Sequence, residues 1–186
     1  MEDDKIIELY FARSEAVITE TSAKYGAFFR RISRNILSSE QDAEECVNDT
    51  YLKAWNSIPP QKPEKLQAYL ARIVRNLSLN RWKKLTADKR GGGEMPVALS
   101  ELEECIPSAD TVQRECDRAE LSAALNSFLR SLPEEKRSVF LRRYWYLVPV
   151  KAIAEQSGMT ESKVKSMLLR TRNELRQFLE KEDIAI

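Results

Sequence analysis

The 186-residue sequence contains no histidine and only three cysteines. The absence of histidine removes the commonest general base of enzymes and the commonest metal ligand of proteins. Cys46, Cys105 and Cys116 are far apart and include no CxxC pair, which argues against a disulfide framework and against a zinc site. We therefore expect no metal and no cofactor, and a reducing, cytoplasmic setting is the simplest interpretation.

Long hydrophobic runs are missing as well. No stretch approaches the ~20 apolar residues that a membrane-spanning helix needs, so we expect no membrane insertion. Residues 1–15 are acidic and charged throughout, unlike a secretory signal peptide. Strand-like alternation of apolar and polar residues does not occur, whereas apolar residues recur at spacings of three and four along much of the chain. The sequence therefore predicts an all-α protein.

The formal net charge is only +1 at pH 7, so any nucleic-acid-binding surface must come from local segregation of charge. Residues 70–90 contain seven Lys or Arg and one Asp, whereas residues 91–120 contain eight acids and two Arg. The acidic stretch begins with three glycines and shows weak periodicity, which predicts a flexible linker. We expect two small helical domains, residues 1–90 and 112–186, joined by a linker at 91–111.

A helix-turn-helix pattern extends from Val150 to Leu179. Gly158 is expected to end the first helix in the left-handed conformation, and Thr160 is expected to cap the second. The second helix has an inward face formed by Val164, Leu168 and Leu175. Polar and basic residues lie mostly off this face: Ser162, Lys163, Lys165, Ser166, Arg170, Arg172 and Arg176. An ordinary helical hairpin with a solvated basic face is the alternative, but the basic residues continue along the second helix, which favours DNA binding.

Helical patterns also fill the N-terminal block. Apolar spacing predicts one or two helices within residues 5–35. A further helix is expected to begin after Ser39, which forms an N-cap signal with Asp42, and to end before Pro59. The outer faces of this third helix are acidic. A solvated surface is the simpler interpretation of these acids, and a protein-docking surface is the more specific one.

The next segment combines a proline-stiffened loop with a basic helix. The loop from Asn56 to Lys65 is an exposed connection of the kind that often carries recognition. In the helix predicted at 66–85, basic residues and amides lie opposite the apolar face, interleaved with Tyr69 and Trp82. This arrangement suits a phosphate track with stacking contacts. The alternative is an amphipathic helix whose C-terminal cations favour the helix dipole.

Four segments, in this order, resemble a single family. DAEECVNDTYLKAW is similar to its polymerase-docking helix, and LQAYLARIVRNLSLNRWKK is similar to its promoter-melting helix. LRSLPEEKRSVFLRRYW and VKAIAEQSGMTESKVKSMLLRTRNEL are similar to its C-terminal domain. The chain thus resembles bacterial RNA polymerase sigma factors of the sigma-70 family, in particular the extracytoplasmic-function (ECF) group, over residues 5–85 and 112–180. The resemblance implies a transcription initiation factor, not an enzyme, that binds polymerase core and promoter DNA.

The resemblance also implies roles for individual residues. Contact with the clamp helices of the β′ subunit would involve Asp42, Glu45, Asp49, Leu52 and Trp55. Recognition and melting of the −10 element would involve Asn56, Lys62, Lys65, Tyr69, Arg72, Arg75, Asn76, Asn80 and Arg81, with the loop catching a flipped base. The −35 duplex would contact Thr160, Ser162, Lys163, Lys165, Ser166 and Arg170. Contact with the β flap, a linker threading toward the active-site channel and inhibition by an anti-sigma protein are further implications.

The sequence departs from the family pattern at four places. The loop with Pro59, Pro60 and Pro63 is unusually proline-rich, so the family's base preference is not carried over to it. Tyr69 stands where the family usually has tryptophan. Residues 167–169, Met-Leu-Leu, follow Ser166, where the family commonly has a positively charged residue and a small one. Residues 147–149 replace the usual glycine-containing turn.

Other functions and another linker structure remain as alternatives. A stand-alone helix-turn-helix regulator would bind duplex DNA without polymerase, with the N-terminal block as a sensor or dimerisation domain. An enzyme acting on nucleic acid would need Mg²⁺ ligands, and Glu44, Glu45 and Asp49 have no further convergent partner in the sequence. Within the predicted linker, three apolar residues could instead dock locally: Leu99, Leu102 and Ile106.

Overall fold

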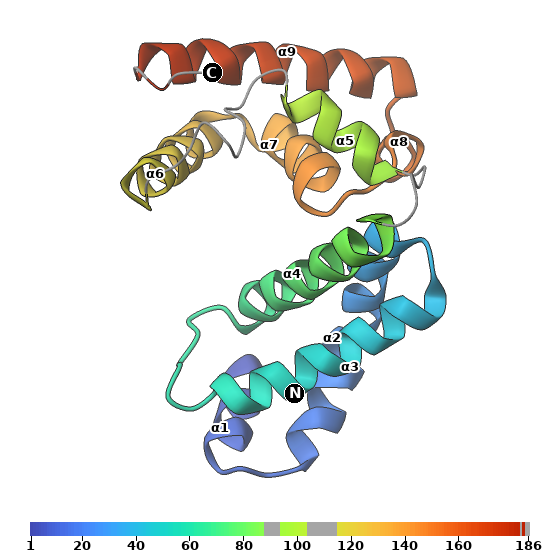
Figure 1. Ribbon diagram of the computed structural model, residues 1–186, viewed down its shortest axis with the longest axis vertical. Helices are drawn as coiled ribbons and strands as arrows, with labels where there is room; N and C mark the ends of the chain where they lie inside the picture. The colour runs from blue at the N-terminus through green and yellow to red at the C-terminus, as the bar shows by residue number, and fades with distance from the viewer. Residues whose placement is uncertain (88–93, 104–114, 183, 185–186) are drawn as a thin grey trace. The chain divides into compact units, whose positions relative to one another are not determined.

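The computed structural model describes residues 1–87, 94–103, 115–182 and 184, and it divides the chain into two compact units. The first unit is Met1–Gly93 and the second is Glu94–Ile186 (Figure 1). Every regular element within the described residues is a helix and none is a strand, which confirms the all-α prediction. Each unit has its own buried apolar core.

In the described part of the first unit, residues 1–87, the helices are α1 (Asp3–Phe11), α2 (Ala16–Leu37), α3 (Glu40–Ser57) and α4 (Leu66–Ala87). Helices α2, α3 and α4 pack against one another, and α1 packs against α2. Fully buried apolar side chains from all four helices fill the core, among them Ile6, Val17, Phe29, Ala43, Leu70 and Val74. A buried hydrogen bond of 2.7 Å between the hydroxyls of Ser33 and Ser78 links α2 to α4.

The start of α3 and the loop after it follow the sequence signals. The Ser39 hydroxyl accepts a hydrogen bond of 3.3 Å from the backbone N–H of Asp42, so the predicted cap is confirmed. The helix ends at Ser57, and the buried Ile58 then anchors the loop to the core, with cis peptide bonds before both following prolines. Lys62 and Lys65 are exposed on this loop.

The second unit contains α5 (Glu94–Glu103), α6 (Glu115–Ser131), α7 (Glu134–Phe140), a π-helical segment η1 (Leu141–Trp145), α8 (Val150–Ser157) and α9 (Glu161–Lys181). Helix α9 packs against α6, α7 and α8. The core of the second unit includes three packed aromatic rings. The ring centroid of Phe128 lies 5.6 Å from that of Phe178 and 6.5 Å from that of Phe140. Pro133 is the N-cap of α7, and its ψ of 146° is extended.

Part of the range predicted as a linker is helical. Helix α5 packs against η1, with Ala98 buried, Leu102 half-buried and Leu99 38% exposed. Residues 94–103 therefore dock locally, which was the alternative to a flexible linker. Ala98 and Glu101 make this contact more than Leu99 does. Ile106 and the rest of the predicted linker lie outside the described residues.

Candidate docking and nucleic-acid interfaces

A mostly acidic stripe of side chains runs along one side of α3. Asp42, Glu45, Asp49 and Leu52 are separated by three or four residues, so they lie on one side of the helix. Glu45 and Asp49 are exposed, and Leu52 is 60% exposed although it is apolar. Trp55 follows one turn later and is half-buried. The five predicted docking residues thus lie on one helix, and an exposed leucine stands among the carboxylates.

A shallow groove of about 450 Å³ adjoins this stripe. Its walls come from the start of α2 and from the C-terminal half of α3: Glu15, Ile18, Asn48, Tyr51, Leu52 and Trp55. The guanidinium of Arg13 lies 5.3 Å from the centroid of the Trp55 ring, and Arg13 also donates a hydrogen bond to the Trp55 carbonyl oxygen. Arg13 therefore fixes the position of Trp55, a role that its place in a short inter-helix turn did not indicate.

Arg81 joins two of the predicted surfaces. Its Nη2 lies 2.7 Å from Oδ1 of Asp42 and 2.8 Å from Oε2 of Glu45, and Nη1 donates to Glu45 at 2.9 Å. Hydrogen bonds from Ser39 and Arg81 lower the pKa of the Asp42 carboxyl below its ordinary value. Arg81, predicted to contact DNA, is therefore held by two acids that were predicted to contact polymerase, and the three residues tie α4 to α3.

The outer face of α4 carries several of the other predicted −10 residues, whereas Lys62 and Lys65 lie on the preceding loop. Arg72, Asn76 and Asn80 recur every four residues and are exposed. The Arg72 guanidinium lies 5.9 Å from the centroid of the Tyr69 ring, and the Tyr69 hydroxyl donates a 2.9 Å hydrogen bond to Ser57 at the end of α3. The aromatic ring and the cation are thus held together beside the end of α3, where Asn56 lies exposed in the last turn of the helix and not in the loop.

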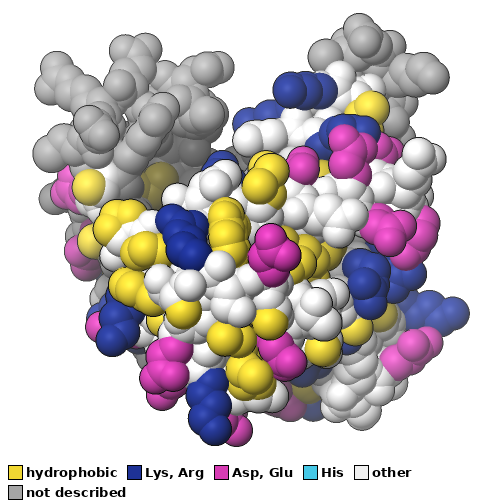
Figure 2. All heavy atoms as spheres, turned by 90° about the horizontal axis from the view of Figure 1, so that it is seen from below, with side chains coloured by type: hydrophobic (Ala, Val, Ile, Leu, Met, Phe, Trp, Pro, Cys, Tyr) yellow, Lys and Arg dark blue, Asp and Glu magenta, His cyan; other side chains and the backbone are white. Residues whose placement is uncertain are grey.

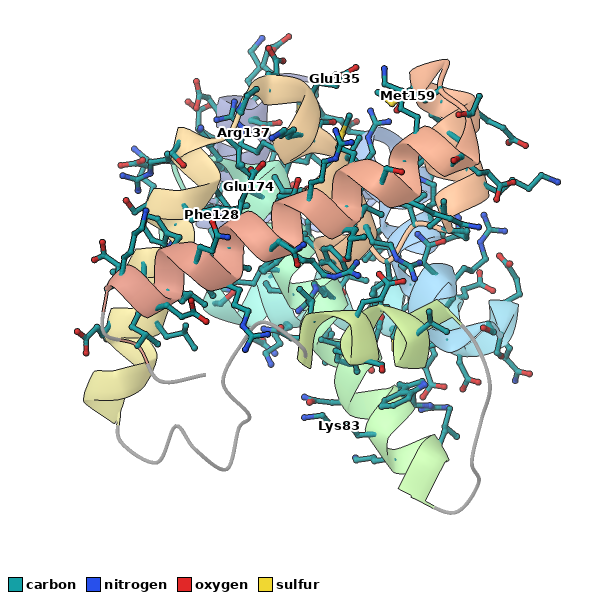
Figure 3. The ribbon with its side chains drawn as sticks, turned by 90° about the horizontal axis from the view of Figure 1, so that it is seen from above. Lys83, Phe128, Glu135, Arg137, Met159 and Glu174 are labelled. Carbon is teal, nitrogen blue, oxygen red and sulfur yellow. The ribbon has the colours of Figure 1, made fainter. Side chains whose placement is uncertain are left out.

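Arg75 differs from its neighbours, because it is half-buried and burial lowers the pKa of its guanidinium. Lys83 lies further along α4 and is exposed (Figure 3). The face seen in Figure 2 carries Lys and Arg side chains interspersed with Asp and Glu around hydrophobic ones. Both signs of charge therefore lie side by side among the described residues of the face seen in Figure 2.

The helix-turn-helix forms as predicted. Gly158 ends α8 with a left-handed φ of 63°, and the Thr160 hydroxyl accepts a 3.2 Å hydrogen bond from the Lys163 backbone N–H (Met159 marks the turn in Figure 3). One side of α9 is buried and consists of Val164, Leu168, Thr171, Leu175 and Leu179. All six predicted −35 residues are exposed: Thr160, Ser162, Lys163, Lys165, Ser166 and Arg170.

Two other polar residues of α9 point back into the unit. Arg172 donates a 2.8 Å hydrogen bond to the Tyr144 hydroxyl and lies 3.5 Å from Glu101. Glu174 pairs with Lys136 of α7 at 2.7 Å (Figure 3). The N-terminal half of α9 therefore keeps three exposed basic residues, Lys163, Lys165 and Arg170, and this is the half that enters the major groove in helix-turn-helix proteins.

The part of the chain that the structure describes contains no group of three or more acidic or cysteine side chains placed to hold a metal ion. In the same residues, no helix is both long and apolar enough to cross a bilayer.

These elements define an all-helical protein with a basic helix in one unit and a helix-turn-helix in the other. Residues 23–87, which contain α3 and α4, match Sigma-70 region 2, and residues 122–175, which contain the helix-turn-helix, match Sigma-70 region 4. The chain belongs to the sigma-70 family.

Its relatives carry the names of RNA polymerase sigma factors. The RNA polymerase sigma-E factor of Streptomyces avermitilis is 25% identical over 157 residues, which are 83% of this chain and 80% of that protein. The ECF RNA polymerase sigma factor SigE of Mycolicibacterium smegmatis is 26% identical over 152 residues, 81% of this chain and 57% of that protein. The RNA polymerase sigma-E factor of Streptomyces antibioticus is 29% identical over 130 residues, 70% of this chain and 64% of that protein. The resemblance to the ECF group is thereby confirmed.

Proposed function

We propose that this protein is an ECF-type sigma factor that binds RNA polymerase core and directs it to specific promoters by recognising their −10 and −35 elements and melting the DNA. The observation that carries this proposal is the presence of both sigma regions in one chain. Region 2 would occupy residues 1–90 and region 4 would occupy residues 112–186. The protein would do no chemistry of its own and would act in the cytoplasm, where polymerase transcribes.

The exposed stripe of α3 would dock on the clamp helices of the β′ subunit. Asp42, Glu45 and Asp49 would meet cations of the partner, and Leu52 would lose its solvent-exposed surface in the contact. Charged rims around an apolar centre are typical of protein interfaces. In the second unit, the domain that carries the helix-turn-helix would contact the β flap.

The outer face of α4 and the preceding loop would hold the melted −10 element. Arg72, Asn76 and Asn80 would contact the backbone or the base edges, Tyr69 offers a ring beside Arg72, and Lys62 and Lys65 are exposed on the loop. Extruding a base costs a few kcal/mol, so a pocket that stacks and hydrogen-bonds that base must offset the loss. Arg75 and Arg81 would contribute from either side of this face.

The N-terminal half of α9 would lie in the major groove of the −35 duplex. Lys163, Lys165 and Arg170 are exposed there and suit phosphate contacts, whereas Ser162 and Ser166 suit base edges. Thr160 would hold the first turn at the groove. An anti-sigma protein would inhibit the factor by covering one of these surfaces.

Co-purification with polymerase core, followed by transcription of a genomic library with and without core, tests the proposal. We expect stable binding to core and new transcription starts that depend on both components. Tight and specific binding to duplex DNA without core, together with no binding to core, would instead indicate a stand-alone regulator.

A further inference from the structure

Leu169 lies in the middle of the exposed face of α9. Ser162, Ser166 and Leu169 are separated by four and three residues, so their side chains stack on one side of the helix. The opposite side is buried in the core through Val164 and Leu168. The leucine therefore points outward on the side that carries the predicted base-contacting serines.

Leu169 is strongly exposed within the helix-turn-helix. Its side chain is 50% exposed, and among the described residues from 119 to 182 it is the large apolar residue with such exposure. A solitary exposed leucine is ordinary on a protein surface. Leu169, however, lies between Ser166 and Arg170. The side chains of Lys163, Ser166 and Arg170 have no hydrogen-bond or ion-pair partner within the described residues.

The chemistry of the major groove limits what a leucine can contact there. Donors and acceptors line the base edges, and the apolar group that the groove of unmodified DNA offers is the C5-methyl of thymine. A leucine pressed against any other base would desolvate polar groups without replacing their hydrogen bonds. We propose that Leu169 is a specificity-determining residue that contacts the C5-methyl of a thymine in the −35 element.

The helix geometry indicates where that thymine lies. Leu169 comes seven residues after Ser162, so the two side chains are roughly 10 Å apart along the helix axis. This length corresponds to about three base pairs of B-DNA if α9 follows the groove. The thymine is therefore about three base pairs from the base that Ser162 faces. The inference rests on the proposed function, because α9 must enter the −35 groove.

Replacing thymine by deoxyuridine removes this methyl and leaves the base pair intact. Each thymine of the −35 element, on either strand, is replaced singly by deoxyuridine in a promoter fragment that the full-length protein binds together with core polymerase. We expect one position at which deoxyuridine weakens binding about fourfold, the loss that corresponds to one buried methyl group. Leu169→Ala is expected to bind the thymine promoter more weakly and to show no further loss at that position.

Val97→Ala is the matched control, because Val97 is an exposed apolar residue of the same unit, 52% exposed on α5, outside the helix-turn-helix. This variant is expected to keep the full sensitivity to deoxyuridine. Two results overturn the inference, provided that the wild type binds the promoter. One is that deoxyuridine weakens binding of the wild type and of Leu169→Ala equally at every position, and the other is that it weakens binding of the wild type at no position. Failure of the wild type to bind promoters with core overturns the proposed function, and the inference with it.

Discussion

Arg143 of η1 and Glu101 of α5 form an ion pair in which Nη2 lies 3.0 Å from Oε1, and the Arg143 side chain is only 1% exposed. Nε of Arg143 donates to the second oxygen of Glu101 at 3.2 Å, so the contact is bidentate. The Tyr144 hydroxyl donates to Glu101 at 2.9 Å. A carboxylate from the predicted linker thus neutralises an arginine inside the domain that carries the helix-turn-helix.

Glu101→Gln is expected to destabilise the second unit by about 2 kcal/mol. The substitution keeps the shape of the side chain but removes the negative charge opposite a buried guanidinium. In a fully buried ion pair, the loss of one charge destabilises the fold by more than this value. Because Glu101 is 26% exposed, solvent offsets part of that loss. Urea denaturation gives the free energy of unfolding, and hydrogen exchange of α9 amides assigns the loss to this unit.

Glu180→Gln provides the control for this prediction. Glu180 pairs with Arg176 at 3.1 Å, but both side chains are more than half exposed. An exposed pair four residues apart on a helix contributes less than about 0.5 kcal/mol. Equal effects of the two substitutions would show that the buried pair adds nothing beyond a surface ion pair.

The same pair predicts how stability depends on pH. Burial raises the pKa of Glu101, but hydrogen bonds from Arg143 and Tyr144 outweigh this effect and lower the pKa below the ordinary value of 4.5. A group whose pKa is lower in the folded state stabilises the fold above its unfolded pKa, and this contribution is lost as the pH falls through the folded pKa. We expect the difference in stability between the wild type and Glu101→Gln to be constant above about pH 5 and to shrink below it. A constant difference down to about pH 3 in urea midpoints would contradict this assignment.

Local signals in the sequence predicted much of the fold because their partners are close in the chain. Ser39 and Thr160 cap helices three residues ahead of the amides they bind, and Gly158 takes the left-handed conformation its type favours. The buried side of α9 follows from spacing alone. The order of the helices and the exposed faces of α3 and α9 were therefore open to prediction.

Pairs between distant residues were not open to prediction in the same way. Glu101 and Arg143 are 42 positions apart, and no periodicity links an acid in a glycine-led segment to an arginine in another helix. The partners of Arg81 are similarly 36 and 39 positions away. Packing decides which cations of a basic helix form ion pairs within the protein. The sequence therefore identified the cations of α4 but did not show that Arg81 pairs with acids of α3 whereas Arg72 is exposed.

Arg81→Ala is expected to lower the denaturation midpoint of the first unit, because Arg81 ties α4 to Asp42 and Glu45 of α3. Arg34→Ala, which breaks an exposed pair with Glu40, is the control and is expected to change the midpoint less. A double-mutant cycle of Arg81→Ala with Glu45→Ala measures the coupling by urea denaturation. Zero coupling, with weaker promoter melting, would leave Arg81 as a DNA contact alone.

The combined substitution of Lys163→Ala and Lys165→Ala is expected to weaken promoter binding by the holoenzyme and to flatten its salt dependence. Each lost phosphate contact reduces the slope of log K against log salt by about 0.9, so the slope should fall by up to about 1.8. Lys181→Ala removes an exposed lysine at the far end of α9 and is expected to leave the slope unchanged. Titrations at several salt concentrations test this, and an unchanged slope in the double variant would remove both lysines from the interface.

Asp49→Arg is expected to abolish co-purification with polymerase core while the fold stays intact. Asp49 is exposed on the stripe of α3, so reversing its charge leaves the core of the unit untouched but places a cation where a cationic partner should approach. Glu44→Arg makes the same charge reversal on the same helix, off the stripe, and is expected to retain binding. Pull-down with tagged core, with circular dichroism to verify helix content, compares the variants. Loss of binding in both would indicate a general effect of charge, and retention in both would place the docking surface elsewhere.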